Sequence, residues 1–302
     1  MIDTALYLFD LKSKFLKINP SEYYLAYSGG KDSHLIYWFL RIYLKEHDHA
    51  MYERYKEIPI IAVNTYMEFP EISRRMIDNA DEVLTPSMKP HEVIAKVGTP
   101  CFGKIKDEFI RRYQNGNRSP HLIKMIDGQK HREVDGKAYK SRFALTDISS
   151  AMLLSGVLPK ISSQCCDYLK KQPSLNYEEK TGRHAILGIT HGESMTRDAK
   201  YKSCFTKDLK FIPLWDADDE LINALNNEYQ IEVPKIYDYI TQTGCAGCPY
   251  GIRQGHTQIE LQLMTPQKRA YVERLFGDAY RVRGLNHLQM DISQYENEKE
   301  NV

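Results

Sequence analysis

Apolar residues along the chain form short blocks that alternate between the spacing of strands and the spacing of helices. The segment 23–27 (YYLAY) is short, rich in aromatic residues and followed by two glycines, which is typical of a strand that ends in a loop. The segment 33–47 repeats its apolar residues with helical spacing and ends in charged residues. Comparable patterns predict further strands at 58–65, 82–87 and 184–190, and a helix that opens with proline at 70–80.

This alternation predicts an α/β fold with a doubly wound, mostly parallel sheet of five or more strands and helices on both faces. We expect residues 1–240 to form this domain, with a basic insertion at about 101–145. Residues 241–302 are expected to form a small, largely helical segment that contains cysteines. Ligands of such sheets bind at the carboxyl ends of the strands, so the loop after the first strand is the first candidate site.

That loop is SGGKDS, at residues 28–33. Its glycines can turn successive backbone N–H groups toward one point, Ser33 starts the next expected helix, and Lys31 adds a positive charge. The pattern therefore predicts a phosphate site, and the alternative interpretation is a Gly-Gly turn with a serine N-cap. It is not a Walker loop, because the spacing G-x-x-x-x-G-K-[ST] is absent.

SGGKDS resembles the PP-loop of the ATP pyrophosphatase and phosphoadenosine phosphosulfate (PAPS) reductase superfamily. Three further stretches resemble segments of that family in the same order: VNTYMEFPE at 63–71, GITHGESMTR at 188–197 and FIPLWDADDELINAL at 211–225. The resemblance covers about residues 20–275 and implies an adenine nucleotide alpha hydrolase-like fold of the HUP type. It also implies that the loop holds a pyrophosphate-like group of an adenine nucleotide, either ATP or a sulfonucleotide (PAPS or its dephospho form, APS).

The resemblance assigns catalytic roles to Lys31, Asp32, Glu193 and Arg197. Glu193 and Arg197 are four residues apart at an expected helix start, so both could project over the nucleotide, and the alternative is an exposed helical ion pair. Glu193 could face a metal such as Mg²⁺, a ribose or an arginine, and Arg197 a phosphate. Glu68 could accept hydrogen bonds from ribose hydroxyls or cap the helix near Pro70. The nucleotide-binding residues implied are Ser28, Gly29, Gly30, Lys31, Asp32, Ser33, Thr65, Glu68, Gly188 and Arg197.

Four cysteines form the second candidate site. Cys165 and Cys166 are adjacent, and Cys245 and Cys248 form a C-x-x-C pair. A C-x-x-C pair alone could be half of a zinc site, a redox pair or chance, and adjacent cysteines are unusual for structural zinc. The whole arrangement, with the basic pair 170–171 after it, resembles the 4Fe-4S signature of assimilatory sulfonucleotide reductases. We therefore expect these four cysteines to hold a 4Fe-4S cluster, with zinc as the alternative.

One departure from the reductases affects the expected reaction. They attack the sulfonucleotide with a cysteine near the carboxyl terminus, whereas this chain has no cysteine after Cys248, and Cys101 or Cys204 would have to replace it. The favoured hypothesis is an activation that releases AMP and pyrophosphate and is coupled to sulfur transfer. A sulfonucleotide reductase that releases sulfite and a non-catalytic nucleotide-binding regulator remain as alternatives. The acceptor, the sulfur donor and the reductant stay open.

The net charge of the whole chain does not indicate a nucleic-acid or membrane partner, since 41 Lys and Arg balance 40 Asp and Glu. Positive charge is concentrated at 101–145, which holds 11 basic and 5 acidic residues and could bind nucleic acid, with Tyr113 as a stacking platform. The alternative is a solvated helix face followed by a hairpin. No apolar run approaches the length of a membrane span, and the amino terminus is unlike a signal peptide, so we expect a cytoplasmic protein without a membrane partner.

Overall fold

The computed structural model describes residues 3–127, 130–134, 137–191 and 203–285. Its contacts divide the chain into two units, of which the first comprises residues 1–86 and 170–243 and the second residues 87–169 and 244–302. The sequence prediction counted residues 87–169 with the first domain. The structure groups them with the carboxyl-terminal segment because Ala279 shares a buried apolar core with Cys101 and Ile110.

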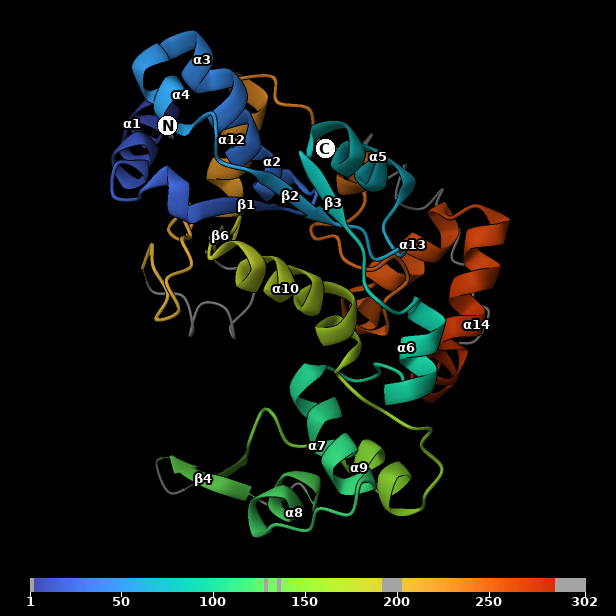
Figure 1. Cartoon of the computed structure of the whole chain (residues 1–302). Helices are drawn as coiled ribbons and strands as arrows, with labels where there is room; N and C mark the ends of the chain where they lie inside the picture. Colours follow the sequence, from blue (N-terminus) through green and yellow to red (C-terminus); the bar gives the residue numbers. More distant parts are fainter. Residues whose placement is uncertain (1–2, 128–129, 135–136, 192–202, 286–302) are drawn as a thin grey trace, which may run out of the picture. The chain divides into compact units, whose positions relative to one another are not determined.

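The first unit is built on a parallel sheet of four strands in the order β3-β2-β1-β6 (Figure 1). Leu25 of the central strand lies opposite Ile60 on one side and Ile186 on the other. The strand order reverses beside β1, and ligands of open α/β sheets bind at such a point. This topology confirms the predicted fold class. The strands are β1 (Tyr23–Tyr27), β2 (Ile60–Val63), β3 (Glu82–Leu84) and β6 (His184–Ile186).

Both faces of this sheet are covered by helices, as Figure 1 shows. On one face Tyr24 packs against Tyr177 of α10 (Gln172–Thr181), with ring centroids 4.9 Å apart. On the other face Phe15, at the end of α1 (Thr4–Phe15), packs edge-on against Phe211 at 5.2 Å. Because neither face meets water, the alternate residues of β1 are apolar or aromatic in both directions.

The helix expected at 33–47 is one continuous helical segment in three parts. It runs as α2 (Lys31–Trp38), a π-helical turn η2 (Phe39–Tyr43) and α3 (Leu44–His47). The helix expected at 70–80 is α5 (Pro70–Asn79). The first unit also contains η1 (Pro20–Glu22), α4 (His49–Tyr55), α12 (Asp219–Glu228) and η4 (Lys235–Asp238).

A fifth strand, which the sequence analysis expected, is reduced to a single contact in the described part of the chain. Phe211 forms an isolated parallel bridge with Ile186 beside the edge strand β6. Pro213 follows two residues later and has no N–H to continue a ladder of hydrogen bonds. Beside β6, the edge of the sheet therefore carries a single bridge and not a full strand.

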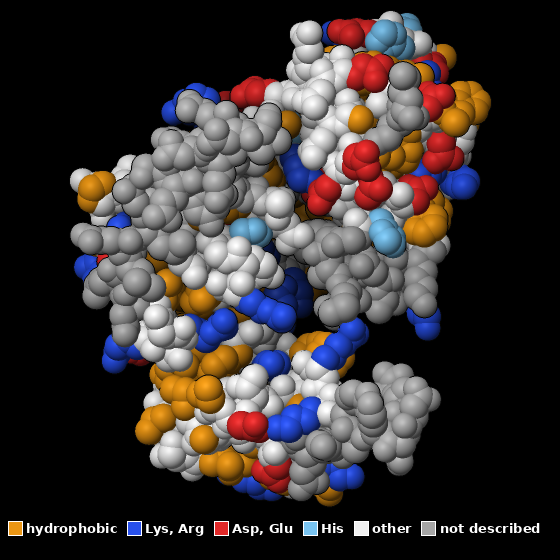
Figure 2. All heavy atoms as spheres, turned by 180° about the vertical axis from the view of Figure 1, so that it is seen from behind, with side chains coloured by type: hydrophobic (Ala, Val, Ile, Leu, Met, Phe, Trp, Pro, Cys, Tyr) orange, Lys and Arg blue, Asp and Glu red, His pale blue; other side chains and the backbone are white. Residues whose placement is uncertain are grey.

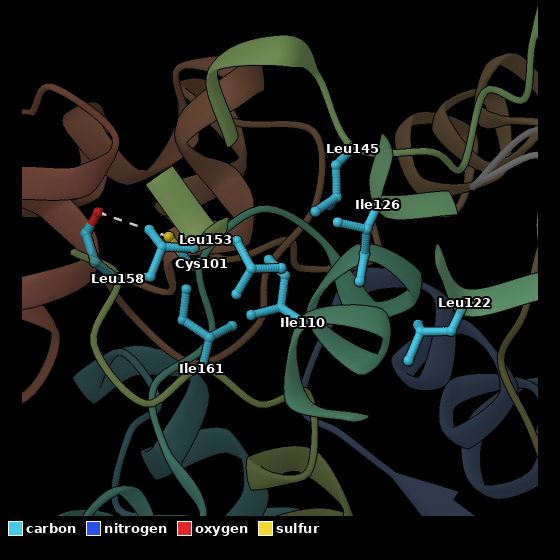
Figure 3. Packing of buried hydrophobic residues seen from close by; sticks show 9 residues of the cluster. Cys101, Ile110, Leu122, Ile126, Leu145, Leu153, Leu158 and Ile161 are labelled. Atoms are coloured by element: carbon cyan, nitrogen blue, oxygen red, sulfur yellow. Dashed lines mark hydrogen bonds between the residues drawn. The ribbon is translucent and has the colours of Figure 1, made fainter. Parts of the chain in front are cut away.

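The second unit is mainly helical and has its own apolar core, shown in Figure 3. Leu122 and Ile126 of one helix pack toward Ile110 of another, and Cys101 completes the cluster beside Leu153. The hairpin expected near residue 130 is present as β4 (Lys130–Val134) and β5 (Lys137–Lys140). The helices are α6 (Pro90–Val97), α7 (Lys104–Gln114), α8 (Pro120–Asp127), α9 (Asp147–Leu154), η5 (Pro249–Gln254), α13 (His256–Leu263) and α14 (Pro266–Val282), and η3 (Asp167–Lys171) leads into the first unit.

Within the residues that the structure describes, no helix combines the length and the apolar composition needed to cross a bilayer.

Replacing Phe211 with alanine should lower the free energy of unfolding by about 3–5 kcal/mol, because its fully buried ring packs against Phe15, Tyr23 and Phe205. Urea denaturation followed by circular dichroism measures the change. Phe9→Ala is the matched control, since that ring is 68% exposed and its loss should cost about 0.5 kcal/mol or less. Equal losses in the two variants would contradict the assigned core.

Candidate functional site: a phosphate-binding loop and a cysteine cluster

A cavity of about 470 Å³ lies in the first unit where β1 and β6 end. Its walls come from the loop after β1, the segment after β6, helix α10 and residues 241–243. Of the residues assigned to the nucleotide, six line it: Ser28, Gly30, Lys31, Asp32, Ser33 and Gly188. The cavity volume falls within the usual range of small-ligand sites, about 300–1,000 Å³.

The loop after β1 is closed by its own serines. The Ser33 hydroxyl accepts a hydrogen bond from the Ser28 N–H at 3.2 Å, donates to the Gly30 carbonyl at 3.2 Å and lies 2.9 Å from the Ser28 hydroxyl. Helix α2 begins at Lys31 with Gly30 as its N-cap residue, so Ser33 stabilises the loop from within the first turn. The simple turn with a serine N-cap is therefore not the observed arrangement.

Glycine is required at position 29 on two grounds. Its φ is +72°, which side chains rarely adopt, and a Cβ there would lie 2.8 Å from the Ile72 carbonyl oxygen and 2.9 Å from Cγ of Met76. Gly29 supports the turn from the α5 side and is not one of the residues that line the cavity. Its contribution in this structure is to the backbone path of the loop.

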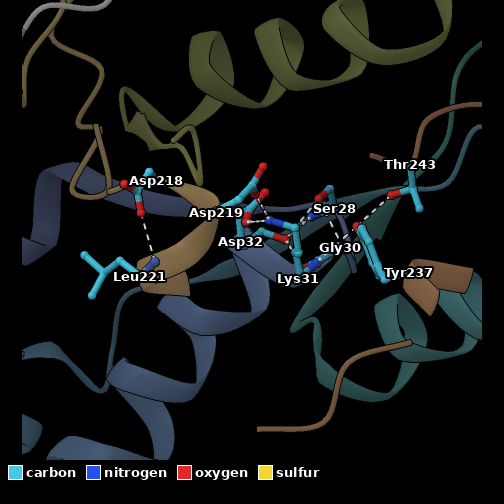
Figure 4. A network of polar contacts seen from close by, with 10 residues as sticks. Ser28, Gly30, Lys31, Asp32, Asp218, Asp219, Leu221, Tyr237 and Thr243 are labelled. Carbon is cyan, nitrogen blue, oxygen red and sulfur yellow. Dashed lines mark hydrogen bonds and ion pairs between the residues drawn. The ribbon is translucent and has the colours of Figure 1, made fainter. Parts of the chain in front are cut away.

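Lys31 is held by two carboxylates, as Figure 4 shows. Its ammonium nitrogen lies 2.8 Å from Asp32 and 2.7 Å from Asp219, and only 8% of its side chain is exposed. Burial alone lowers the pKa of Lys31, and the two ion pairs outweigh burial, so the pKa lies above its ordinary value. Lys31 therefore stays protonated at the first turn of α2, with its charge paired to Asp32 and Asp219.

Gly188 provides the closest approach between β6 and the loop. A Cβ at this position would lie 2.7 Å from the backbone nitrogen of Ser33 and 2.9 Å from the carbonyl carbon of Asp32. The segment after β6 thus rests directly on the backbone at the start of α2. Glycine at 188 is needed for this contact, whatever the cavity binds.

Thr65 and Glu68, which were also assigned to the nucleotide, are not among the residues that line the cavity. They bind each other, with the Thr65 hydroxyl 2.7 Å and its N–H 3.1 Å from the Glu68 carboxylate. Glu68 does not cap α5 either, because Phe69 is the N-cap residue and makes no side-chain cap there in the described structure. Glu193 and Arg197 lie outside the described residues.

Several cavity residues were missed by the sequence analysis. Asp219 belongs to the acidic start of α12, a local signal that could have suggested a partner for Lys31. Tyr237 reaches the loop from a distant part of the chain and has no such signal. At the other end of the cavity the Tyr24 hydroxyl donates to Glu178 at 3.0 Å. Four lysines (31, 170, 171 and 210) and three acidic residues (32, 178 and 219) line the cavity.

The four cysteines predicted to bind a cluster lie together in the second unit. The pKa of Cys165 is raised, first by a hydrogen bond between its thiol and that of Cys166, then by burial, and further by the nearby Cys248 and Cys245. Burial also raises the pKa of Cys248, with Cys245 and Cys166 adding to the effect. The described residues nevertheless contain no set of three His, Cys, Asp or Glu side chains already arranged around a metal position.

The C-x-x-C turn is held from three sides. The Glu260 carboxylate accepts the Gly247 N–H at 2.7 Å, the Tyr280 hydroxyl donates to the Gly247 carbonyl, and the Thr257 hydroxyl donates to the Cys248 carbonyl at 2.6 Å. Gly247 has a φ of +72°, and a Cβ there would lie 2.3 Å from Cγ1 of Val272. Burial raises the pKa of Glu260 to about 7. These contacts preorganise the turn that presents Cys245 and Cys248.

The two remaining cysteines occupy different environments. Cys101 is fully buried in the apolar core, and burial raises the pKa of its thiol to about 12, so it is protonated and shielded at neutral pH. Cys204 is partly exposed in the first unit, where its carbonyl accepts the Ile212 N–H at 2.7 Å. Cys101 is therefore unsuited to the role of a nucleophile.

The basic segment 101–145 uses several of its cations internally. Arg111 pairs with Glu108 at 2.7 Å, Lys140 pairs with Asp147, and the Arg118 guanidinium lies 3.6 Å from the ring centroid of Tyr113. Figure 2 shows Lys and Arg interspersed with acidic and apolar side chains on this part of the second unit. Binding of nucleic acid by this segment stays a prediction.

Comparisons with known proteins found a likeness to solved structures. No protein-family model matches the chain. No curated protein matches it. Among solved structures, it is similar to a phosphoadenylyl-sulfate (PAPS) reductase from Candida auris in a phosphate complex, with 10% sequence identity and a TM-score of 0.35 over 76% of this chain and 89% of that one.

Replacing Gly188 with alanine should displace the start of α2, because the added methyl meets backbone atoms that cannot rotate away. We expect a loss of about 1–3 kcal/mol of stability and about tenfold weaker binding of inorganic pyrophosphate. Denaturation and isothermal titration calorimetry measure the two effects. Gly277→Ala is the control, since a Cβ there meets no described atom within 4 Å and alanine should stabilise α14 by about 0.5–1 kcal/mol. Unchanged pyrophosphate affinity in Gly188→Ala would argue against this site.

Proposed function

We propose that the chain is a PP-loop enzyme that binds ATP in the cavity of the first unit and releases AMP and pyrophosphate, in order to activate an acceptor for sulfur transfer. The observation that carries the proposal is the convergence of the closed loop, the first turn of α2 and the charged Lys31 on one cavity. Each of these three features favours an anion, and together they favour a group with several phosphate oxygens.

The first turn of α2 supports the position of the pyrophosphate. A helix N-terminus carries a partial positive charge and backbone donors, and this one begins after Gly30, which lines the cavity. Lys31 lies beside it with Asp32 and Asp219 as its present partners. A bound pyrophosphate would share the ammonium with these carboxylates and would gain from its permanent charge.

The reaction follows from this placement. An oxygen of the acceptor attacks the α-phosphorus of ATP, the bond to the β,γ-pyrophosphate breaks, and the acceptor oxygen carries the adenylyl group. Sulfur at the oxidation level of sulfide then replaces that oxygen on the acceptor, and AMP leaves with it. Lys31 and the first turn of α2 would offset the negative charge that develops on the leaving pyrophosphate. The chain would thereby lower the barrier of the first step by electrostatics and positioning.

The cysteine cluster extends the proposal to a cofactor. We propose Cys165, Cys166, Cys245 and Cys248 as the ligands of a 4Fe-4S cluster, which would supply electron transfer or a binding position for sulfur. A single zinc ion would require thiolates about 3.8 Å apart, given Zn–S bonds of about 2.3 Å in a tetrahedron. The thiols of Cys165 and Cys166 share a hydrogen bond, and Cys248 and Cys245 lie close enough to raise the pKa of Cys165. The four grouped thiols and the preorganised C-x-x-C turn support a metal centre of this kind, and zinc stays the alternative metal.

Lys31→Ala should weaken the binding of ATP and of pyrophosphate by about 10- to 100-fold, the usual effect of losing a charged hydrogen-bond donor. Titration calorimetry measures the affinities, and Lys17→Ala, an exposed lysine of the same unit, is the control. Product analysis then separates the functions: AMP with pyrophosphate supports the proposal, sulfite from PAPS or APS supports a reductase, and binding without either product indicates a regulator. Unchanged affinity in Lys31→Ala would reject the site.

Serine at any one of the four cluster cysteines should lower the iron and acid-labile sulfide bound by anaerobically purified protein, together with its visible absorption. Cys204→Ser should leave all three unchanged, because Cys204 lies in the first unit and outside the cysteine group. Stoichiometric zinc that depends on the same four cysteines would favour the alternative metal. Iron content that is insensitive to these substitutions would refute the ligand assignment.

A further inference from the structure

A tyrosine hydroxyl accepts a hydrogen bond from the first backbone N–H of α2. The Lys31 N–H donates to the hydroxyl oxygen of Tyr237 at 3.2 Å, and this hydroxyl lies 2.8 Å from the hydroxyl of Thr243 (Figure 4). Tyr237 belongs to η4 and Thr243 to the segment that follows, and both line the cavity. A donor expected to face a phosphate is thus already engaged by the protein itself.

The contact is close as well as polar. A Cβ on Gly30 would lie 2.7 Å from the Tyr237 hydroxyl oxygen and 3.6 Å from the Thr243 hydroxyl oxygen. Burial and the neighbouring Asp32 raise the pKa of Tyr237, despite the opposing hydrogen bonds from Thr243 and the Lys31 N–H, so the hydroxyl stays neutral. A neutral hydroxyl oxygen is a weaker acceptor than a charged phosphate oxygen. The present contact is therefore one that a phosphate could replace.

We propose that Tyr237 is a positioning residue that occupies the place of a phosphate oxygen in the nucleotide-free protein and must leave it when a phosphate group binds. Thr243 holds the hydroxyl over the loop until then. Only a strong hydrogen-bond acceptor can therefore enter the site. A polyanion such as pyrophosphate displaces the Tyr237 hydroxyl, and a weaker acceptor does not. This inference rests on the phosphate site of the proposed function and adds to it a competitor supplied by the chain.

Titration of the whole protein with inorganic pyrophosphate tests the inference. Tyr237→Phe removes the competing acceptor and keeps the ring, so pyrophosphate should bind between about twofold and tenfold more tightly. Thr243→Val should give a smaller gain in the same direction, because it only loosens the hydroxyl. Tyr239→Phe, a change of the same chemistry at a partly exposed tyrosine nearby, should leave the affinity unchanged. Thermal denaturation checks that each variant folds, and Thr243→Val serves as the second variant if Tyr237→Phe does not.

A double substitution tests the contact itself. Gly30 has a φ of −74°, so alanine is allowed by the backbone and its methyl meets chiefly the Tyr237 hydroxyl. Gly30→Ala should therefore be more destabilising in the wild-type chain than in the Tyr237→Phe chain, and the two effects on the melting temperature should not add. Additive effects would show that Tyr237 does not rest on Gly30 and would overturn the inference.

The outcomes separate this inference from the function on which it rests. Tighter pyrophosphate binding by Tyr237→Phe supports both. If the wild-type protein and Tyr237→Phe bind pyrophosphate equally well, the hydroxyl does not compete with phosphate, and the phosphate site itself is unaffected. If the wild-type protein binds pyrophosphate more tightly than Tyr237→Phe, the hydroxyl is instead a ligand of the phosphate. A wild-type protein and a Tyr237→Phe variant that both fail to bind pyrophosphate overturn the phosphate site and the inference together.

Discussion

The structure of the first unit depends on how closely two backbones meet at the start of α2. The segment after β6 rests on Asp32 and Ser33, and α5 rests on the loop from another direction, with glycine at both contacts. A side chain at Gly29 would meet α5, and one at Gly188 would meet the backbone of Asp32 and Ser33. Serine hydroxyls close the loop, and the Lys31 ammonium is paired with Asp32. The backbone path of the loop is therefore fixed by contacts within the chain.

The local sequence pattern was sufficient to predict the strands of the sheet and the helices that cover its two faces. The strand at 23–27 and the helix opening at Pro70 were predicted closely, because aromatic and β-branched runs and helix-start signals are local. The loop at 28–33 was recognisable because its glycines and Lys31 are contiguous. Tyr237 was not, since its contact with Lys31 joins residues far apart in sequence and no periodicity marks it. The pairing of Thr65 with Glu68 likewise depends on side-chain directions that residue types do not specify.

The cysteines show the same division between local and distant information. Their types and spacing drew attention to four of the six, and the structure brings those four within mutual electrostatic reach. The support of the C-x-x-C turn by Glu260, Thr257 and Tyr280 could not be anticipated, because a glutamate in a helical pattern normally indicates a solvated face, whereas Glu260 is buried. The grouping of residues 87–169 with the carboxyl-terminal segment was also hidden, since shared burial of Ala279 with Cys101 leaves no pattern in either segment alone.

The order of strands along the chain has a consequence for how the protein is made. Tyr23 of β1 pairs with His184 of β6, about 160 residues later. Strand β6 is followed by Gly188, which packs against the backbone at the end of the loop. Closing so long an interval is entropically costly and slow compared with the pairing of β1 with β2. During synthesis the ribosome delivers the loop long before its supporting strand, and β1 then has one unpaired edge. During that period the loop after β1 lacks the contact with Gly188 that supports it in the folded unit.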